Sequence, residues 1–196
     1  MRLILASSSH YRRSLLERLG LPFECHSPDV DETPQPQEKP SQLAQRLAQA
    51  KAQAVAQLYP DALVIGSDQV AALGDEPIGK AGSHSKALQQ LQRLSGQTVV
   101  FQTAVCISHG HQIATALVPT ECRFRTLTSA EIEHYLLQDL PYDTAGSAKA
   151  EQLGIALMES LRSDDPTAII GLPLIAVCSL LRQFGVNPLQ PVATGL

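Results

Sequence analysis

The sequence predicts an α/β fold, because short apolar runs of strand length alternate with longer stretches of helical period. Residues 62–65 form an apolar run with the length and β-branched content of a buried strand. Residues 3–6 form a second such run, followed by serines that are suited to capping a helix. A long amphipathic helix is expected at about residues 41–58. We therefore expect strands packed against helices within a single domain over residues 1–196.

The composition is typical of a soluble globular protein. Hydrophobic residues make up 44% of the chain and charged residues 17%, and no apolar run approaches the roughly 20 residues of a membrane span. The net charge of −4 gives no support to binding of a nucleic-acid polymer. The four cysteines are scattered without a C-x-x-C pair, so neither a zinc site nor a disulfide framework is expected. We expect a cytoplasmic protein that has no membrane partner.

Asp68 is the first candidate for chemistry. Gly66 and Ser67 are expected to end the strand at residues 62–65, so that Asp68 lies where the strand's carboxyl end meets solvent. A carboxylate in that position can bind a metal or take a proton from water. An isolated aspartate at such a place more often caps a turn, so this residue alone does not decide between the two.

Lys80 follows a turn rich in glycine and proline and adds a cation that could meet phosphate. Residues 74–80 also spell G-x-x-x-x-G-K, which is the start of a P-loop motif. The next residue is Ala81 rather than Ser or Thr, so the hydroxyl that would bind magnesium is missing. No helix is expected to begin there either, and we reject a P-loop.

The first helix carries a basic turn at its start. Tyr11, Arg12 and Arg13 follow the serines at residues 7–9, where free backbone N–H groups and hydroxyls are also expected. Arginines oppose the helix macrodipole at this end, so they do not help stability there. They are suited to holding a phosphate, although a solvated basic turn is an equally good interpretation.

An acidic loop and one lysine provide further candidates. Residues 26–40 are rich in proline and acidic residues, and Glu32 belongs to a cluster that could hold a divalent cation through its oxygens. An acidic loop on its own is usually just solvated. Lys51 falls on the apolar stripe of the helix at residues 41–58. It must either extend out to solvent or reach a cleft between elements, and we favour the cleft.

The alternation of elements continues along the chain. A helix is expected at about residues 85–94, a strand at residues 98–107 and a half-exposed strand around residues 122–124. Residues 108–111 are expected to form a hairpin turn between the two strands. The two histidines of that turn have no third ligand in view, so we interpret them as exposed turn residues rather than a metal site.

The last third of the chain contains two helices and a loop. Thr128 and Glu131 form a capping box that opens a helix. Residues 145–151 form a loop of small residues that also carries a lysine and a glutamate. The final apolar helix is expected to start at residues 171–173, with Pro173 in its first turn.

Seven short motifs, in their order and spacing, make the chain resemble the Maf-like nucleotide pyrophosphatases over nearly its whole length. They are Leu-Ala-Ser-Ser-Ser-x-x-Arg-Arg at 5–13, Asp-Glu at 31–32, Ala-x-x-Lys-Ala at 48–52, Gly-Ser-Asp-Gln at 66–69, Gly-Lys at 79–80, Ala-Gly-Ser-x-Lys-x-Glu at 145–151 and Gly-Leu-Pro-Leu at 171–174. His10, Ala81 and Ala104 stand where this family usually has Pro, Pro and Gly.

The resemblance implies a fold, a reaction and a set of roles. The fold is an elongated mixed β-sheet flanked by helices, with two lobes and a central cleft, as in inosine-triphosphatase-like proteins. The reaction is metal-dependent cleavage of a nucleoside triphosphate to a monophosphate and pyrophosphate, with Mg²⁺, Mn²⁺ or Co²⁺ as the cofactor. The roles fall on residues that match the motifs: Asp68 as the base, Glu32 and Asp68 as metal ligands, and Ser7, Arg12, Arg13, Lys51 and Lys80 as phosphate contacts.

The Ser-Asp-Gln and Lys-x-Glu variants resemble the subfamily that hydrolyses 7-methyl-GTP. In that interpretation Tyr11, Gln69 and Glu151 contact the base or ribose. Tyr11 could instead have only a packing role, and Glu151 could form a surface ion pair with Lys149. Two alternatives remain: a dTTP- or UTP-type Maf pyrophosphatase, and a non-catalytic nucleotide-binding regulator of septum formation. The expected partner is a small nucleotide, and a homodimer is one possible assembly.

Overall fold

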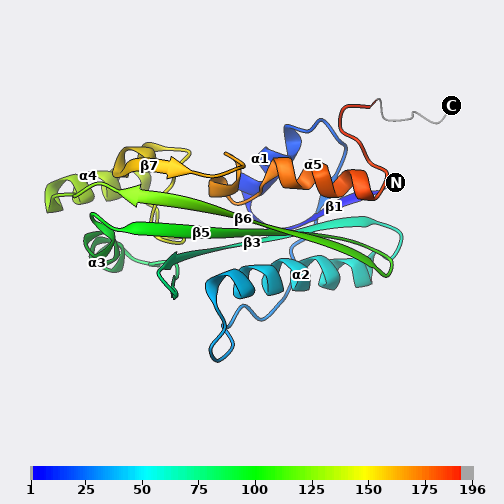
Figure 1. The fold of residues 1–196 in the computed structure, drawn as a ribbon, viewed down its shortest axis with the longest axis horizontal. Coiled ribbons are helices and arrows are strands. Elements are labelled where there is room, and N and C mark those ends of the chain that lie inside the picture. Colours follow the sequence, from blue (N-terminus) through cyan, green and yellow to red (C-terminus); the bar gives the residue numbers. More distant parts are fainter. Residues whose placement is uncertain (1, 191–196) are drawn as a thin grey trace.

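The computed structural model describes residues 2–190 (Figure 1). Within this range seven strands form one mixed sheet. The strands are β1 (Leu3–Ala6), β2 (Glu24–Cys25), β3 (Leu63–Leu73), β4 (Glu76–Ile78), β5 (Thr98–His109), β6 (Gln112–Phe124) and β7 (Met158–Arg162). The helices are α1 (His10–Glu17), α2 (Pro40–Leu58), α3 (His84–Leu94), α4 (Ser129–Asp139) and α5 (Leu174–Gln183), with the 3-10 helices η1 (Leu153–Leu157) and η2 (Ala168–Ile170).

The sheet has the order β2-β1-β3-β5-β6-β7, and β4 pairs with β3 outside this path. Strands β3, β5 and β6 are antiparallel to their neighbours in this group and run along the length of the molecule (Figure 1). Strand β1 is parallel to both β2 and β3. The predicted elongated mixed β-sheet flanked by helices is therefore confirmed.

The two edges of β3 are paired differently. One edge pairs with β5 without interruption from Val64 to Ala72. The opposite edge pairs with β1 as far as Gly66 and with β4 from Ala71 onward. In the described part of the chain, residues 67–70 therefore have no strand partner on that edge. The sheet has a gap there, and the side chains of the Gly-Ser-Asp-Gln motif lie beside it.

Two lobes share the long strands, as predicted. In the first lobe α2 covers one face of the sheet while α1 and α5 cover the other, and an apolar core lies on each face (Figure 1). In the second lobe α3 and α4 pack with β4, β5, β6 and β7 around a third core, which contains Phe101 and Phe124. The gap beside β3 lies between these two groups of core residues.

The predicted end of the third strand is wrong. The strand was expected to stop at Gly66 and Ser67, but β3 continues to Leu73 and Asp68 lies near its middle. The reason is that β5 provides hydrogen-bond partners for the backbone of β3 at the polar residues too. The strand therefore continues although its side chains become polar. The carboxyl end that opens the site is that of β1, which stops opposite Gly66.

Several local predictions are confirmed and two need correction. The long helix, the hairpin turn between β5 and β6, and the capping box at Thr128 are all present. His109, however, belongs to β5 and is half-buried, with its Nδ1 atom 3.2 Å from the Ala62 carbonyl oxygen. Pro173 is the N-cap of α5 rather than a residue of its first turn.

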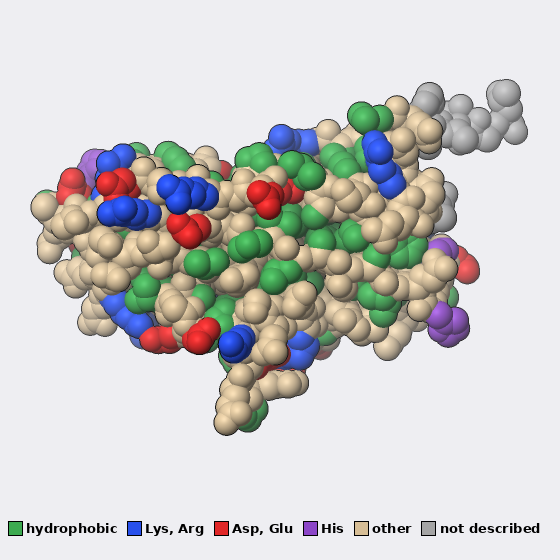
Figure 2. Space-filling model, in the orientation of Figure 1, with side chains coloured by type: hydrophobic (Ala, Val, Ile, Leu, Met, Phe, Trp, Pro, Cys, Tyr) green, Lys and Arg blue, Asp and Glu red, His purple; other side chains and the backbone are tan. Residues whose placement is uncertain are grey.

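The surface in Figure 2 carries charges of both signs. Acidic and basic side chains lie beside one another over β6 and β7, and Arg123 and Glu159 form an exposed ion pair there at 2.8 Å. The loop before α2 projects from the body of the molecule. Among the described residues no helix is both long and apolar enough to cross a membrane.

Helix α2 packs very closely on β3 at Gly66. A Cβ atom built on Gly66 would lie 2.3 Å from the Ala48 carbonyl oxygen and 2.5 Å from the Ala52 backbone nitrogen. These contacts are to helix backbone, which cannot rotate away as a side chain can. The close approach also brings Lys51, one residue before Ala52, over the middle of β3.

Gly66→Ala should therefore destabilise the protein by at least about 1–3 kcal/mol, which is the usual cost of overpacking a core. Urea denaturation followed by circular dichroism would measure the change. Gly79→Ala is the matched control, because a Cβ atom there would meet nothing within 4 Å. Equal stabilities for the two variants would contradict a close contact between α2 and Gly66.

Candidate active site

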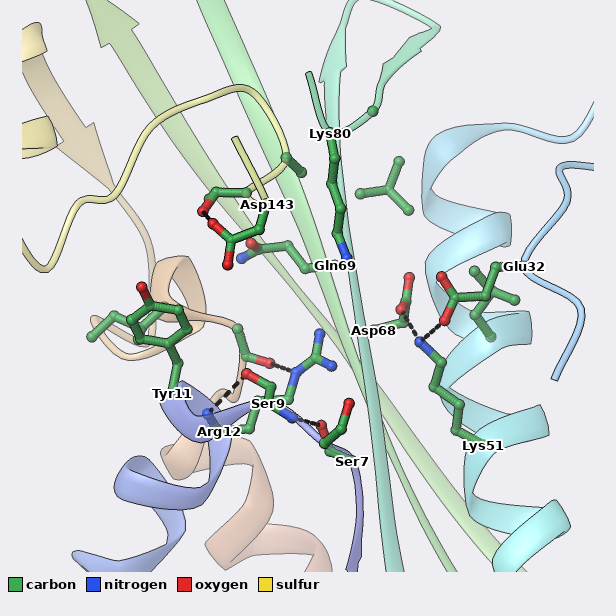
Figure 3. Close-up of a pocket in the computed structure, with 18 of the residues that line it drawn as sticks. Ser7, Ser9, Tyr11, Arg12, Glu32, Lys51, Asp68, Gln69, Lys80 and Asp143 are labelled. Carbon is green, nitrogen blue, oxygen red and sulfur yellow. Dashed lines mark hydrogen bonds and ion pairs between the residues drawn. The ribbon is translucent and has the colours of Figure 1, made fainter. Parts of the chain in front are cut away.

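A cavity of about 780 Å³ opens at the gap beside β3, and both lobes contribute to its walls (Figure 3). The first lobe supplies the loop between β1 and α1, the loop before α2, and α2 itself. The second lobe supplies the end of β4 and the loop at residues 143–151, while η2 and the following Gly171 close one side. The predicted central cleft is thus present.

Lys51 joins two carboxylates at one wall of the cavity. Its Nζ atom lies 2.7 Å from Asp68 Oδ1 and 2.6 Å from Glu32 Oε1 (Figure 3). Lys51 is only 7% exposed, so the prediction that it reaches a cleft is confirmed and extension to solvent is excluded. The three side chains come from α2, β3 and the acidic loop, and they form a continuous set of charges.

The surroundings change the acidity of both carboxyls. Burial raises the pKa of Asp68 above its ordinary value, although the positive charges of Lys51 and Arg12 oppose this rise. Partial burial also acts to raise the pKa of Glu32. The hydrogen bond and charge of Lys51, with the charges of Lys80 and Arg12, outweigh that effect and hold the pKa below its ordinary value.

Arg12 is held against the end of η2. Its Nε atom donates a hydrogen bond of 2.8 Å to the Gly171 carbonyl oxygen, which also accepts one of 2.9 Å from the Ser67 hydroxyl. This contact leaves the two terminal nitrogens of the guanidinium directed into the cavity (Figure 3). Burial lowers the pKa of Arg12, and the nearby Asp68 and Glu32 charges oppose that effect. Because an arginine stays charged in proteins, the cavity keeps this cation.

The serines before α1 also line the cavity. Ser9 is the N-cap of α1, and its hydroxyl accepts a bond of 3.4 Å from the Arg12 backbone nitrogen. The buried Ser7 hydroxyl accepts a bond of 3.1 Å from the Ser9 backbone nitrogen. These bonds hold the loop at the point where β1 ends, so that its backbone and hydroxyls face the cavity.

Lys80 and Arg13 differ in their placement. Lys80 follows β4, its backbone bridges to Ala145, and its ammonium points into the cavity (Figure 3). Arg13 does not line the cavity, because its exposed side chain pairs with Glu17 at 3.0 Å on the surface of α1. Of the predicted phosphate contacts, the structure thus brings together Ser7, Arg12, Lys51 and Lys80 but not Arg13.

The predicted base contacts Tyr11, Gln69 and Glu151 also line the cavity, and Tyr11 lies across it from Lys51 in Figure 3. Partial burial raises the pKa of the Glu151 carboxyl. Gln69 is more constrained, because its amide nitrogen donates to the Thr103 hydroxyl and to two backbone carbonyls of η2 at 2.9–3.1 Å. Gln69 therefore anchors η2, and its amide N–H groups already have acceptors in the protein.

Asp143 is a cavity residue that the sequence did not reveal. It lies opposite β3 in Figure 3, and its Oδ1 atom is 3.7 Å from the Lys149 ammonium. No ion pair between Lys149 and Glu151 is present in the described range, because the Lys149 ammonium instead donates to the Asp139 carbonyl oxygen at 3.1 Å. Asp143 lies two residues before the 145–151 motif, but no pattern indicated that this loop folds back over the cavity.

Within residues 2–190, two carboxylates converge at the proposed metal position. Among residues 2–190 no group of three or more histidine, cysteine or acidic side chains is arranged to hold a metal ion. Glu32 and Asp68 nevertheless bracket one cationic atom, the Nζ of Lys51. Mg²⁺ and related ions are commonly held by one or two carboxylates while substrate phosphates complete the shell. The pair therefore fits a divalent ion that binds together with a phosphate ligand.

Comparison with known proteins agrees with this geometry. The Maf-like protein family model matches residues 2–184. The 7-methyl-GTP pyrophosphatase of Bordetella pertussis is 62% identical over 188 residues, which cover 96% of this chain and 94% of the relative. The 7-methyl-GTP pyrophosphatase of Cupriavidus metallidurans is 54% identical over 185 residues, or 93% of each chain.

Among solved structures, the Staphylococcus aureus Ham1 protein aligns with a TM-score of 0.48 and 14% identity, over 64% of this chain and 73% of that chain. That likeness is too weak to bear on fold or function. The family match, in contrast, covers every motif that supplies a side chain to the cavity. This chain therefore belongs to the Maf-like family.

Proposed function

We propose that this chain, a nucleotide pyrophosphatase, hydrolyses 7-methyl-GTP to 7-methyl-GMP and pyrophosphate. One observation carries the proposal: Arg12, Lys51 and Lys80 converge with the carboxylates of Glu32 and Asp68 on one cavity between the lobes. Phosphoryl transfer requires cations together with carboxylates, because the protein must neutralise phosphate charge and position a water. The relatives named 7-methyl-GTP pyrophosphatase support the choice of substrate.

Asp68 is the proposed base. Its Oδ1 atom accepts the Lys51 hydrogen bond, and no protein group among the described residues donates to Oδ2. That second oxygen can accept a proton from a water that attacks the α-phosphorus. A new bond forms between this water oxygen and phosphorus, and the bond to the oxygen bridging the α- and β-phosphorus atoms breaks. The raised pKa of Asp68 makes it a stronger base than an ordinary carboxylate.

The cations hold the triphosphate and stabilise the leaving pyrophosphate. Arg12 can donate hydrogen bonds to phosphate oxygens through both terminal nitrogens, and its Nε bond to the Gly171 carbonyl keeps the guanidinium oriented. Lys80 approaches from the opposite lobe, so a bound triphosphate would contact both halves of the cavity. Glu32 and Asp68 would hold Mg²⁺, Mn²⁺ or Co²⁺, which would supply further neutralisation of phosphate charge.

A second group of cavity residues is suited to binding a positively charged nucleobase. A 7-methylated guanine carries a positive charge, and it presents N1–H and N2–H donors along one edge. Tyr11 offers an aromatic face, which is worth about 0.5–2 kcal/mol to such a cation. Glu151 can accept both edge donors, and Asp143 adds a second negative charge nearby.

Asp68→Asn should abolish turnover while leaving the fold intact. The amide is isosteric but cannot accept the proton, and loss of general-base catalysis costs roughly 10²–10⁴-fold in kcat. Single-turnover kinetics with saturating Mg²⁺ would measure the loss. A folded variant with nearly normal kcat would exclude Asp68 as the base.

Lys51→Met should lower kcat/KM and move the acid limb of its pH profile to higher pH. The Lys51 charge lowers the pKa of Asp68, so its removal raises that pKa and leaves more Asp68 protonated at any given pH. The stability of the Lys51→Met protein should also fall as pH rises through the new pKa of Asp68. The loss should be about 1–3 kcal/mol, because the ionised and buried Asp68 carboxylate then lacks its hydrogen-bond donor.

Lys51→Arg is the control for this experiment, because it keeps a positive charge beside Asp68. It should leave the acid limb closer to its original position than Lys51→Met does. An acid limb that stays in place in the methionine variant would show that Lys51 does not govern the protonation of Asp68.

Glu151→Gln should reduce kcat/KM for 7-methyl-GTP relative to UTP and dTTP. Uracil and thymine present one N–H between two carbonyl oxygens, so a carboxylate repels them whereas an amide can accommodate them. Pyrophosphate release from 7-methyl-GTP, GTP, UTP and dTTP would be compared in both proteins. A wild-type preference for UTP or dTTP would overturn the proposed substrate and leave only the general pyrophosphatase activity.

A further inference from the structure

The Lys51 ammonium occupies a position between the two carboxylates that the proposed function assigns to a divalent cation. Its Nζ atom lies 2.6 Å from Glu32 Oε1 and 2.7 Å from Asp68 Oδ1, and the residue is almost fully buried. In Figure 3 both dashed lines from these carboxylates meet at this one nitrogen. The protein therefore already contains a cation that offsets part of the negative charge of the pair.

Lys51 differs in this respect from the other cations of the cavity. Arg12 donates its Nε hydrogen bond to the Gly171 carbonyl oxygen, and in the described residues Lys80 makes no ion pair with either carboxylate. Lys51 is also delivered by a fixed element, because the backbone of α2 packs directly against Gly66 two residues before Asp68. Its placement thus follows from the packing of the fold.

A divalent ion bound between Asp68 Oδ1 and Glu32 Oε1 would compete with the Lys51 ammonium for one position. Mg²⁺ ligand distances are about 2.0–2.1 Å, so an ion bound to both carboxylates would stand where the ammonium now lies. The two cations would also repel one another at such short range. Binding of the divalent ion therefore requires another acceptor for the Lys51 ammonium, and in this cavity phosphate oxygens are the acceptors that a nucleotide would bring.

We propose that Lys51 acts as a built-in counter-cation, which occupies the metal position in the free protein and moves to the phosphates when a nucleotide binds. The inference rests on the proposed function for the identity of the incoming ligand. Glu32 can accommodate the exchange, because it lies in a loop and its side chain is 58% exposed. The free protein should then bind divalent cations weakly, and metal and nucleotide should bind together.

The test is direct Mn²⁺ binding at pH 8, with the free ion followed by electron paramagnetic resonance in the absence of any nucleotide. Lys51→Met should bind Mn²⁺ at least about tenfold more tightly than wild type, because the competing charge is gone. A 7-methyl-GTP analogue with a methylene bridge between the α- and β-phosphorus atoms should largely remove this difference. Lys51→Gln serves as a second neutral variant in case the methionine protein does not fold.

Lys80→Met is the matched control, since it removes the same charge from the same cavity without emptying the position between Glu32 and Asp68. Its Mn²⁺ affinity should stay close to that of wild type. Wild-type protein that binds Mn²⁺ as tightly as Lys51→Met and Lys51→Gln, or a Lys80→Met gain equal to theirs, would overturn the counter-cation role. Turnover of 7-methyl-GTP is measured separately, so failure of the proposed function is distinguished from failure of this inference.

Discussion

The gap in strand pairing beside β3 is the constraint on which the site depends. Strand β1 stops opposite Gly66 and β4 begins opposite Ala71, so the edge between them meets the cavity instead of another strand. Continuous pairing with β5 on the other edge keeps this stretch straight and satisfies its backbone. Ser67, Asp68 and Gln69 are therefore held on a rigid element and at the same time lie beside an open cavity.

The two most deeply buried charges of the cavity, Lys51 and Asp68, are paired with each other, as buried charges usually must be. Asp68 is 7% exposed, and burial raises its pKa while the positive charges of Lys51 and Arg12 oppose that rise. Arg12 is in turn oriented by the Gly171 carbonyl, which Ser67 also contacts. Arg12, Lys51 and Asp68 are thus connected by hydrogen bonds and by charge. This coupling links the end of η2 to the middle of β3 and to α2.

The elements of the fold were largely predictable from local patterns, but the depth and partners of the site residues were not. The apolar run at residues 62–65 identified β3, yet the polar residues that follow suggested an end that β5 pairing removes. Lys51 was correctly predicted to reach a cleft, because a lysine on an apolar stripe has few other options. Asp143 was missed, since no local signal indicates that its loop folds over the cavity.

The sequence by itself determined the α/β class, the two early strands, the helices and the set of charged residue types, because these depend on periodicity and on side-chain chemistry. Tertiary structure alone decided which of those residues meet. Arg13 and Arg12 are adjacent in the chain, but the turn of α1 directs one to solvent and the other to Gly171. Lys51 lies between Glu32 and Asp68 because α2 packs backbone against backbone on Gly66, a contact between segments far apart in the chain.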